Sequence, residues 1–448
     1  MLVTMCVGYF LVLLDVTIVN VALPQIGSGL HTHVNGLQWV VDAYALALAS
    51  LMLAGGTIGD LRGHKRIVLI GLAVFGIGSL GCALAPNVGA LVAGRAVQGV
   101  GAALLLPGTL AIVSQTFPDR RAQARAIGVW AGVGSLALPA GPLLGGALIA
   151  AFGWRAVFMI NVPIVLLAIA ACVVVVRESR QTGARRLDAA GAALGALFLL
   201  ALTFAFIEGG RPGAARPEVV IAAVCAVMLL VTFVLVERRR GEQAMLQLGL
   251  LRRPAFSAAN GAAGAMNLGT LGMLFVLTLF LQQVQHRSAL DAGLCLVPLF
   301  APLAVLAPLA GRLTSRIGPR LPTVAGLTVA AGGLTLLLAA DARSGYLVLL
   351  PAFLLWGIGI GVLTPAVVAG AIAAVPERRE GLASAVNNTA RQAAGAIGIA
   401  VAGAIAGQPG SAGFTGGFHT VALLAACLYL LTAAAALFLI PGKRAAAS

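Results

Sequence analysis

The sequence LVTMCVGYFLVLLDVTIVNVALP, residues Leu2–Pro24, decides how the rest of the chain is interpreted. About 20 apolar residues in a helix span the ~30 Å hydrocarbon core of a bilayer. Asp15 lies well inside this run, where an ionisable side chain costs roughly 2.5–3.5 kcal/mol on insertion scales. Such a group is rarely found at that depth without a partner or a task. We therefore expect a membrane helix that carries a functional carboxylate.

The composition indicates a membrane protein throughout. Of the 448 residues, 60% are hydrophobic and 10% are charged, whereas a soluble domain has about 25% charged residues. The net charge of +15 would suggest nucleic-acid binding in a soluble protein. Here the basic residues lie almost wholly in short loops, which indicates membrane topology and no nucleic-acid partner. Hydrophobic segments interrupted by Pro and Gly favour helices over a β-barrel.

Fourteen hydrophobic segments are long enough to cross a bilayer as helices. They are approximately 2–24, 36–58, 67–85, 88–114, 124–150, 157–176, 189–208, 217–236, 255–281, 290–311, 321–340, 346–374, 382–407 and 418–440. Several exceed 25 residues, which helix tilt accommodates. The sequence therefore predicts an all-α, polytopic membrane protein with 14 transmembrane helices.

Basic residues are divided unequally between alternate loops. With the N-terminus inside, the cytoplasmic loops and C-terminal tail hold 22 of the 29 Lys and Arg residues, the outer loops hold 5, and 2 lie within spans. This division predicts an even number of helices with both termini cytoplasmic. The first run is too long for a cleavable signal peptide, contains Asp15 and lacks a basic start. Because it begins almost inside the membrane, a short N-terminal tail is expected to be missing from this start site.

One loop pattern occurs twice. GTIGDLRGHKR at Gly56–Arg66 and GRLTSRIGPR at Gly311–Arg320 each begin with Gly and have a second Gly seven residues on. Each follows the second helix of a six-helix set if the seventh and eighth spans are an insertion. Repeated halves around a central site are how many secondary transporters are built. We predict a six-helix bundle at 1–176, an inserted helix pair with its linkers at 177–254, and a second six-helix bundle at 255–448.

Further segments carry a family resemblance, and they are spread over the whole chain. They are LDVTIVNVALP (Leu14–Pro24), GTIGDLRGHKR (Gly56–Arg66), RAVQGVGAA (Arg95–Ala103), GVGSLALPAGPLLGG (Gly132–Gly146), WRAVFMINVP (Trp154–Pro163) and ASAVNNTARQAAGAIG (Ala383–Gly398). In this order and spacing they resemble the fourteen-helix drug:proton antiporters of the major facilitator superfamily, the EmrB/QacA type.

The resemblance implies a proton-coupled secondary transporter that exports drugs or other lipophilic small molecules by alternating access. It further implies a multi-pass protein of the cytoplasmic membrane. We expect a monomer, although the sequence does not determine the oligomeric state. Its partners would be the small-molecule substrate, protons and the lipid bilayer. It would have no enzymatic activity and no cofactor, the proton motive force being its energy source.

Asp15 and Arg95 are the first candidates for proton coupling. Asp15 lies nine residues before Pro24, and Arg95 lies seven residues after Val88. At 1.5 Å per residue the two side chains are at similar depth, within one helical turn. A carboxylate beside an arginine stays charged, and exposure to an aqueous cavity or cationic ligand lets it exchange its proton. The resemblance implies coupling roles for both residues, and the alternative is a static structural ion pair.

Asp42 is a second acidic candidate, followed by Tyr44 in the second span. It is either a carboxylate for a cationic substrate and proton coupling, or a solvated cap at the mouth of the helix.

A polar stripe in the thirteenth span carries Asn387, Asn388 and Arg391. Asn387 and Arg391 are four residues apart and share a helix face. Such a stripe deep in a bilayer should face the bundle interior or a water-filled cavity, so we expect these residues to line the substrate cavity. The alternative is hydrogen bonding between helices. The same argument applies more weakly to Asn20, Gln98, Asn161, Asn260 and Asn267, for most of which we expect hydrogen bonding between helices. The remaining candidates for the substrate cavity are Asn20, Gln98 and Tyr44.

The loop Gly56–Arg66 resembles the superfamily's cytoplasmic gating motif. The resemblance assigns conformational-gate roles to Gly56, Asp60, Arg62, Gly63, Lys65 and Arg66. The alternative is a simple positive-inside turn. In the second copy Ser315 replaces the acid, so we carry the gate function to the first copy alone.

The fifth span contains a motif of small residues that the resemblance links to exporters. Its members are Gly134, Gly141, Pro142, Gly145 and Gly146. Physically, small residues permit close approach of helices, and a proline removes one backbone hydrogen bond and bends the helix.

Other chemistry finds little support in the sequence. His31 and His33 are two residues apart but have no neighbouring Cys, Asp or Glu, so no metal site is expected. The six cysteines lie inside apolar runs and form no CxxC pair, so we interpret them as small hydrophobic residues. No GxxxxGK[ST] phosphate loop occurs, which disfavours direct use of ATP.

The substrate stays open at this stage. Asp15 and Asp42 suit lipophilic cations, whereas Arg391 favours neutral or anionic compounds. One alternative function is therefore a dedicated exporter of a single metabolite or self-made antibiotic. A non-transporting membrane sensor or scaffold would need a sizeable soluble domain, but the longest loop has about 18 residues. An intramembrane enzyme is disfavoured by the lack of a His/Asp/Glu cluster.

Overall fold

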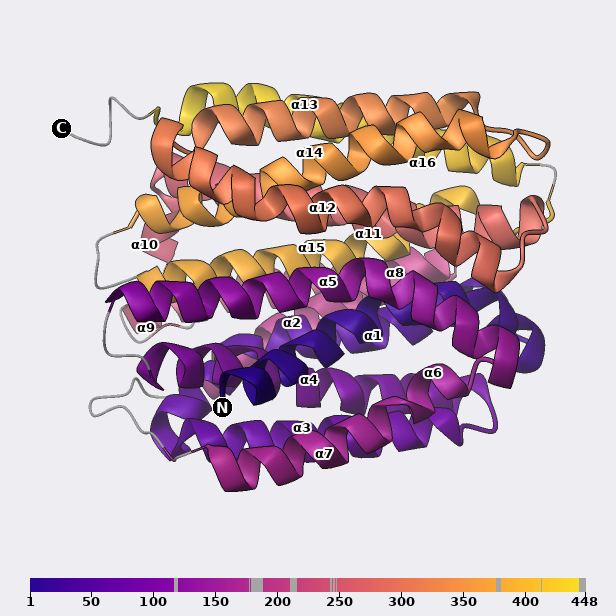
Figure 1. Cartoon of the computed structure of the whole chain (residues 1–448). Coiled ribbons are helices and arrows are strands. Elements are labelled where there is room, and N and C mark those ends of the chain that lie inside the picture. The colour runs from indigo at the N-terminus through magenta and orange to yellow at the C-terminus, as the bar shows by residue number, and fades with distance from the viewer. Residues whose placement is uncertain are drawn as a thin grey trace. The chain divides into compact units, whose positions relative to one another are not determined.

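The computed structural model describes residues 1–116, 120–176, 178, 188–209, 216–241, 244, 246, 248–375, 380–411 and 413–442. Over these residues the chain forms helices and no strand (Figure 1). The elements are α1 (Leu2–Gly29), α2 (Val34–Arg62), α3 (His64–Ala83), α4 (Val88–Thr116), α5 (Arg120–Phe152), α6 (Ala156–Met159), α7 (Asn161–Val175), α8 (Ala189–Gly209), α9 (Pro217–Arg240), α10 (Leu248–Leu251), α11 (Pro254–Leu279), the π-helix η2 (Phe280–Val284), α12 (Ala289–Ile317), α13 (Arg320–Leu336), the 3₁₀ turn η3 (Leu337–Ala339), α14 (Tyr346–Ala373), α15 (Glu380–Ala406) and α16 (Phe414–Leu439).

Thirteen helical segments within the described ranges are long and apolar enough to cross a membrane. They correspond to thirteen of the fourteen predicted spans. The remaining span is α2, a continuous helix of 29 residues in which the side chains at positions 53 and 60 lie outside the described part of the chain. The prediction of an all-helical, multi-pass membrane protein is confirmed, while the fourteenth crossing and the cytoplasmic termini stay predictions.

Several predicted spans differ from the observed helices, most clearly in two places. The first helix continues through Pro24 to Gly29, because a proline is tolerated in a membrane helix where neighbouring groups satisfy the freed carbonyl. The predicted span 157–176 is divided into α6 and α7, with the break at Ile160.

The helices group into two compact units. One consists of Met1–Leu202 with Ile221–Leu246, and the other of Thr203–Val220 with Gln247–Ser448. We call them the N-terminal and C-terminal units. The division passes through α8 and α9, and the predicted boundaries at 176 and 254 stay predictions.

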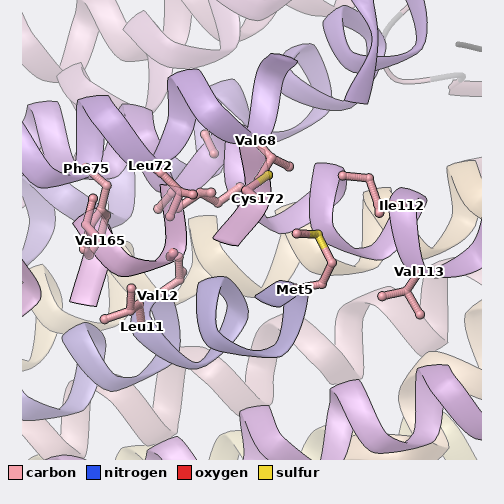
Figure 2. Packing of buried hydrophobic residues seen from close by; sticks show 14 of the residues in the cluster. Met5, Leu11, Val12, Val68, Leu72, Phe75, Ile112, Val113, Val165 and Cys172 are labelled. Atoms are coloured by element: carbon pink, nitrogen blue, oxygen red, sulfur yellow. The ribbon is translucent and has the colours of Figure 1, made fainter. Parts of the chain in front are cut away.

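In the N-terminal unit, α4 packs against both α2 and α3, α1 packs along α5, and α3 packs along α7. A hydrophobic core draws on α1, α2, α3, α4, α5 and α7, and Figure 2 shows Met5, Phe75, Ile112 and Cys172 among its members. All four of these side chains are buried. The helices that supply this core also carry the buried polar residues described below.

Two glycines let α4 lie close to both neighbours. A Cβ on Gly99 would lie 2.4 Å from the carbonyl oxygen of Tyr44 in α2. A Cβ on Gly101 would lie 2.5 Å from the amide nitrogen of Phe75 in α3. Residues two apart point to opposite sides of a helix, so these glycines serve opposite faces of α4. Close backbone approach through small residues is the usual packing mode in membranes.

In the C-terminal unit, α11 packs against α15 and α16, while α14 packs against α12 and α13. Glycines again permit close approach: a Cβ on Gly398 would lie 2.2 Å from the carbonyl oxygen of Leu268. The buried Tyr429 of α16 donates its hydroxyl to the carbonyl of Met266 in α11 at 2.7 Å.

The repeated loop has the same local conformation in both copies. Gly63 ends α2 with φ 101°, and Gly318 ends α12 with φ 86°. Both values lie in the left-handed region, where a residue with a Cβ is strained and glycine is not. The second glycine of each repeated sequence, Gly63 or Gly318, therefore ends a helix with a positive φ angle.

We predict that Gly101→Ala destabilises the protein, because the added methyl group would overlap the backbone of α3. Overpacking of a tight interior typically costs about 1–3 kcal/mol. The measurement is the melting temperature in detergent, and the matched control is Gly81→Ala in α3, where a Cβ meets no atom within 4 Å. Equal melting temperatures for the two variants would contradict the described contact between α3 and α4.

Candidate functional site

The structure brings Asp15 and Arg95 into direct contact in the N-terminal unit. Asp15 Oδ2 accepts a hydrogen bond from Arg95 Nη1, which joins α1 to α4 by an ion pair. Both side chains are buried, with 0% and 1% of their surfaces exposed. The similar depth expected from helical rise is therefore realised as an intramembrane pair.

Arg95 is held by further partners on two helices. Its Nε donates to the carbonyl oxygen of Val40 in α2 at 3.0 Å. Its Nη1 also donates to Gln98 Oε1 at 2.9 Å, because residues three apart share one face of α4. The guanidinium carbon lies 4.3 Å from the ring centre of Tyr44, close enough for a cation–π interaction. The cation is thus compensated from several directions, as burial requires.

Asp15 is equally well supplied with donors. Its Oδ1 accepts from Gln98 Nε2 at 3.2 Å and from Asn161 Nδ2 at 3.4 Å. Both amide groups also donate to the Ser79 hydroxyl, at 2.7 and 3.4 Å. The Cys82 thiol donates to Gln98 Oε1 at 3.4 Å. We call these residues with Arg95 the Asp15 network; it supplies both carboxyl oxygens of Asp15 with hydrogen-bond donors.

Asp42 has the opposite environment. It is 0% exposed, and neither carboxyl oxygen has a hydrogen-bond partner in the described part of the chain. The solvated helix cap considered as an alternative is therefore not what the structure contains. A buried carboxylate without a partner is very unfavourable, so this group is stable here as the neutral acid.

The other candidates of the N-terminal unit are also buried. Tyr44 donates its hydroxyl to the carbonyl of Val12 at 3.2 Å. Asn20 donates to the carbonyl of Val16 at 2.7 Å, while its Oδ1 is buried without a partner among the described residues. Gln98 belongs to the Asp15 network. None of the three lines an open space in this conformation, because each is at most 4% exposed.

The polar stripe of α15 lies against α11 in the C-terminal unit. Asn387 is buried and donates to Asn260 Oδ1 at 3.3 Å, which is the interhelical hydrogen bonding considered as the alternative. Arg391 is partly buried and donates to Asn267 Oδ1 at 3.5 Å. Asn388 is exposed. Asn387 is therefore buried between α11 and α15, whereas Asn388 and Arg391 have surface that is accessible.

The predicted gate comprises the last turns of α2, Gly63 and the first turn of α3. The Asp60 side chain lies outside the described residues, and a Cβ on Gly56 would lie 3.5 Å from Pro107 in α4. Arg62 and Arg66 are exposed, as a positive loop requires. Lys65 donates its Nζ to the carbonyl of Val173 at the end of α7, at 2.8 Å.

Glu178 binds the other side of this loop. Its two carboxyl oxygens accept the backbone N–H groups of Lys65 at 3.1 Å and Arg66 at 3.3 Å. These amides belong to the first turn of α3, where a carboxylate satisfies orphan donors and complements the helix dipole. A Cβ on Gly63 would lie 2.4 Å from Glu178 Oε1, so the glycine makes room for the carboxylate. The segment after α7 is thereby fastened to the predicted gate.

The small-residue motif of α5 faces α1. A Cβ on Gly141 would lie 1.9 Å from Thr17 Oγ1, and one on Gly145 would lie 2.9 Å from Ile18 Cγ1. A Cβ on Gly134 would lie 2.0 Å from the ring of Tyr9. Pro142 and Gly146, which follow Gly141 and Gly145, are also buried. The motif therefore sets the close contact between α5 and the helix that carries Asp15.

An apolar recess of about 220 Å³ is lined by residues of α1 and α5. Its lining residues are Leu2, Val3, Cys6, Val7, Phe10, Val129 and Val133. Next to it, the rings of Tyr9 and Trp130 stack with their centres 3.7 Å apart. Such a surface can contact the apolar part of a small molecule and offers no charged group.

Comparison of the sequence with models of known protein families identifies the family of this chain. The family model described as "Major Facilitator Superfamily" matches residues 5–399, which is most of the chain. The chain belongs to the Major Facilitator Superfamily. The corresponding part of the sequence resemblance is confirmed, and the EmrB/QacA subtype is not decided by this match.

Several relatives of this facilitator are named for drug resistance. It is 37% identical over 398 residues to the multidrug resistance protein Stp of Mycobacterium tuberculosis, covering 89% of this chain and 74% of Stp. It is 37% identical to the puromycin resistance protein pur8 of Streptomyces alboniger, covering 89% and 80% of the two chains. It is 34% identical to the methylenomycin A resistance protein of Bacillus subtilis, covering 90% and 86%.

A solved structure supports the fold. The crystal structure of the peptide transporter POT in complex with sulfate superposes with a TM-score of 0.72, covering 97% of the facilitator and 93% of that chain. At 17% identity this likeness shows the fold alone.

Sequence reasoning missed two residues of the facilitator's N-terminal unit. Ser79 was overlooked because a serine in an apolar helix is usually unremarkable, yet it shares a helix face with Cys82, three residues on. Glu178 is the acid directly after the sixth predicted span, and its sequence separation of 113 residues from Lys65 hid the contact. The available signal for Glu178 was an acidic residue in a loop that is otherwise basic.

We predict that Gly63→Ala loosens the start of α3. Alanine at φ 101° is strained, and its methyl group would also displace the Glu178 carboxylate from the amides of Lys65 and Arg66. Loss of such a cap typically costs about 0.5–2 kcal/mol. The measurement is hydrogen exchange at these two amides.

The control for this variant is Gly153→Ala. Gly153 has φ 79°, but a Cβ there meets no atom within 4 Å, so it isolates the effect of backbone strain. If both variants leave the Lys65 and Arg66 amides equally protected, the Glu178 cap does not hold the loop.

Proposed function

We propose that this facilitator is a proton-driven exporter of drugs or other lipophilic small molecules. The observation that carries this proposal is the identity of 34–37% over about nine-tenths of the chain to proteins named for multidrug, puromycin and methylenomycin A resistance. The buried Asp15–Arg95 pair supports proton coupling, because an intramembrane carboxylate is a functional group by default. We also propose that the protein lies in the cytoplasmic membrane and exports its substrate by alternating access.

The proposed topology has fourteen membrane helices with both termini in the cytoplasm, as in the EmrB/QacA type. The excess of basic residues in alternate loops supports it. In this arrangement a membrane potential of 100 mV supplies about 2.3 kcal/mol for each charge moved inward. That free energy sustains a roughly 50-fold substrate gradient in electrogenic exchange.

Asp15 and Asp42 divide the proposed coupling between them. In the described conformation Asp15 is paired with Arg95, whereas neither carboxyl oxygen of Asp42 has a partner among the described residues. Proton release from Asp42 and proton uptake by Asp15 both require a rearrangement that changes access or pairing. A conformational change is therefore coupled to proton movement by electrostatics alone.

The apolar recess between α1 and α5 supports a lipophilic substrate, as does the lack of a charged group in its lining. Arg391 is the candidate for orienting a neutral or anionic compound, since its surface is partly accessible. A dedicated exporter of one compound is the second candidate function, favoured by the relatives that are named for a single antibiotic.

The test is proton release from inside-acid proteoliposomes on addition of ethidium, a lipophilic cation, or chloramphenicol, a neutral antibiotic. We expect at least one compound, or another drug from a wider screen, to discharge the pH gradient through the wild-type protein. Response to several unrelated compounds supports multidrug export, and response to one supports the dedicated exporter. No response from any compound, in protein that retains its fold, would contradict export.

We predict that Asp15→Asn and Asp42→Asn both abolish this exchange but differ in stability. Asp15→Asn leaves the Arg95 cation buried without its counter-charge, which typically costs 3–5 kcal/mol, so its melting temperature falls. Asp42→Asn replaces a neutral acid by a neutral amide of the same shape and keeps a melting temperature near that of the wild type. The measurements are the proteoliposome assay and thermal unfolding in detergent.

The control is Asp291→Asn at the exposed start of α12, which should exchange normally. Normal exchange by Asp15→Asn would make the ion pair a static structural element. Normal exchange by Asp42→Asn would remove that residue from the coupling mechanism.

A further inference from the structure

A buried pair of carboxyl groups joins the start of α8 to the end of α9 within the N-terminal unit. Asp188 directly precedes α8 and is 6% exposed, and Glu237 lies in the last turn of α9 and is 1% exposed. A Cβ on Gly191 would lie 2.3 Å from Glu237 Oε1 and 2.8 Å from Asp188 Oδ2. The two carboxyl groups therefore lie side by side over this glycine.

The surroundings of Asp188 favour its ionised form. Its Oδ1 accepts the backbone N–H of Gly191 at 2.7 Å, which caps the first turn of α8. The same oxygen accepts from Arg240 Nη1 at 2.5 Å. A helix N-terminus and a guanidinium both stabilise negative charge, so the charge of this pair resides on Asp188.

The surroundings of Glu237 leave one oxygen for a proton. Its Oε2 accepts the backbone N–H of Leu246 at 2.6 Å. Its Oε1 is buried, has no donor among the described residues and faces Asp188. Two adjacent carboxylates in a buried site cannot both ionise without a large cost. A proton on Glu237 Oε1 removes the second charge and turns that oxygen into a donor.

We infer that Asp188 and Glu237 bind one proton between them, carried on Glu237 Oε1 and donated to Asp188 Oδ2. This proton closes a clasp formed by three pieces of chain, namely the residue before α8, the last turn of α9, and Leu246. The inference does not depend on the transport mechanism, because neither Asp15 nor Asp42 belongs to the clasp.

Loss of the proton opens the clasp. In the described structure the charged groups that act on Glu237 are Asp188 and Arg240. Deprotonation leaves two carboxylates against one guanidinium, and their repulsion weakens the hold on Leu246. The clasp is therefore closed at low pH and opens as the pH rises. In the proposed topology these helix ends lie in the cytoplasm, so the clasp responds to cytoplasmic pH.

The test is hydrogen exchange of the Leu246 amide in the full-length protein in detergent between pH 6 and 9, corrected for the intrinsic pH dependence of exchange. Wild-type protection should fall as the pH rises. Glu237→Gln should remain protected throughout, because its amide oxygen still accepts from Leu246 and its NH₂ group still donates to Asp188. The control Glu218→Gln, at the exposed start of α9, should behave as the wild type.

Equal corrected pH dependence in the wild type and Glu237→Gln would overturn the inference. A second measurement does not need that variant to fold. Infrared difference spectra should contain a protonated-carboxyl C=O band that disappears as the pH rises. Asp188→Asn removes the facing charge, so this band should disappear at lower pH than in the wild type. If this band disappears at the same pH in Asp188→Asn as in the wild type, the inference of a shared proton would also be overturned.

Discussion

The burial of the Arg95 guanidinium is the constraint on which the N-terminal unit depends. A guanidinium cannot be neutralised in a protein, so its charge must be compensated where it stands. The compensation comes from three helices: the Asp15 carboxylate of α1, the Val40 carbonyl of α2 and the Gln98 amide of α4 itself. The Tyr44 ring of α2 covers one side of the cation. Moving any one of these helices leaves a charge or a donor unpaired, so the charge fixes their relative positions.

That constraint explains where the glycines of the N-terminal unit occur. Gln98 reaches the Ser79 hydroxyl at 2.7 Å only because α3 and α4 lie very close together. A Cβ on Gly78 would lie 2.6 Å from the backbone nitrogen of Gln98, and one on Gly94 would lie 2.7 Å from Cys82 Sγ. Short polar side chains cannot span a normal interhelical distance, so the small residues are a condition for the polar network.

Much of this arrangement could be predicted from the sequence, and the exceptions have physical reasons. Hydrophobic length predicted the helices, and helical rise placed Asp15 at the depth of Arg95. Neither argument could predict the rotation of a helix about its axis, which decides whether Asp42 is solvated or buried. Side-chain contacts between distant segments, such as Glu178 with the amides of α3, depend on helix packing and leave no periodic signal. The two positive-φ loop glycines were predictable as a repeat, because a left-handed turn restricts the residue type locally.

The unequal states of Asp15 and Asp42 give the proposed coupling its direction. Asp15 has charge-stabilising donors on both oxygens, so a proton can bind there only after Arg95 has left or water has entered. Asp42 has none, so it can lose its proton only after a partner or water has arrived. Arg95 binds the Asp15 carboxyl group on α1 and the Val40 carbonyl on α2, so it is tied to both helices that carry the two acids. In the proposed cycle the Asp15–Arg95 pair must separate before Asp15 binds a proton, and Asp42 must gain a partner or water before it releases one. Both proton transfers therefore require α1 or α2 to move relative to α4, which links proton movement to a conformational change.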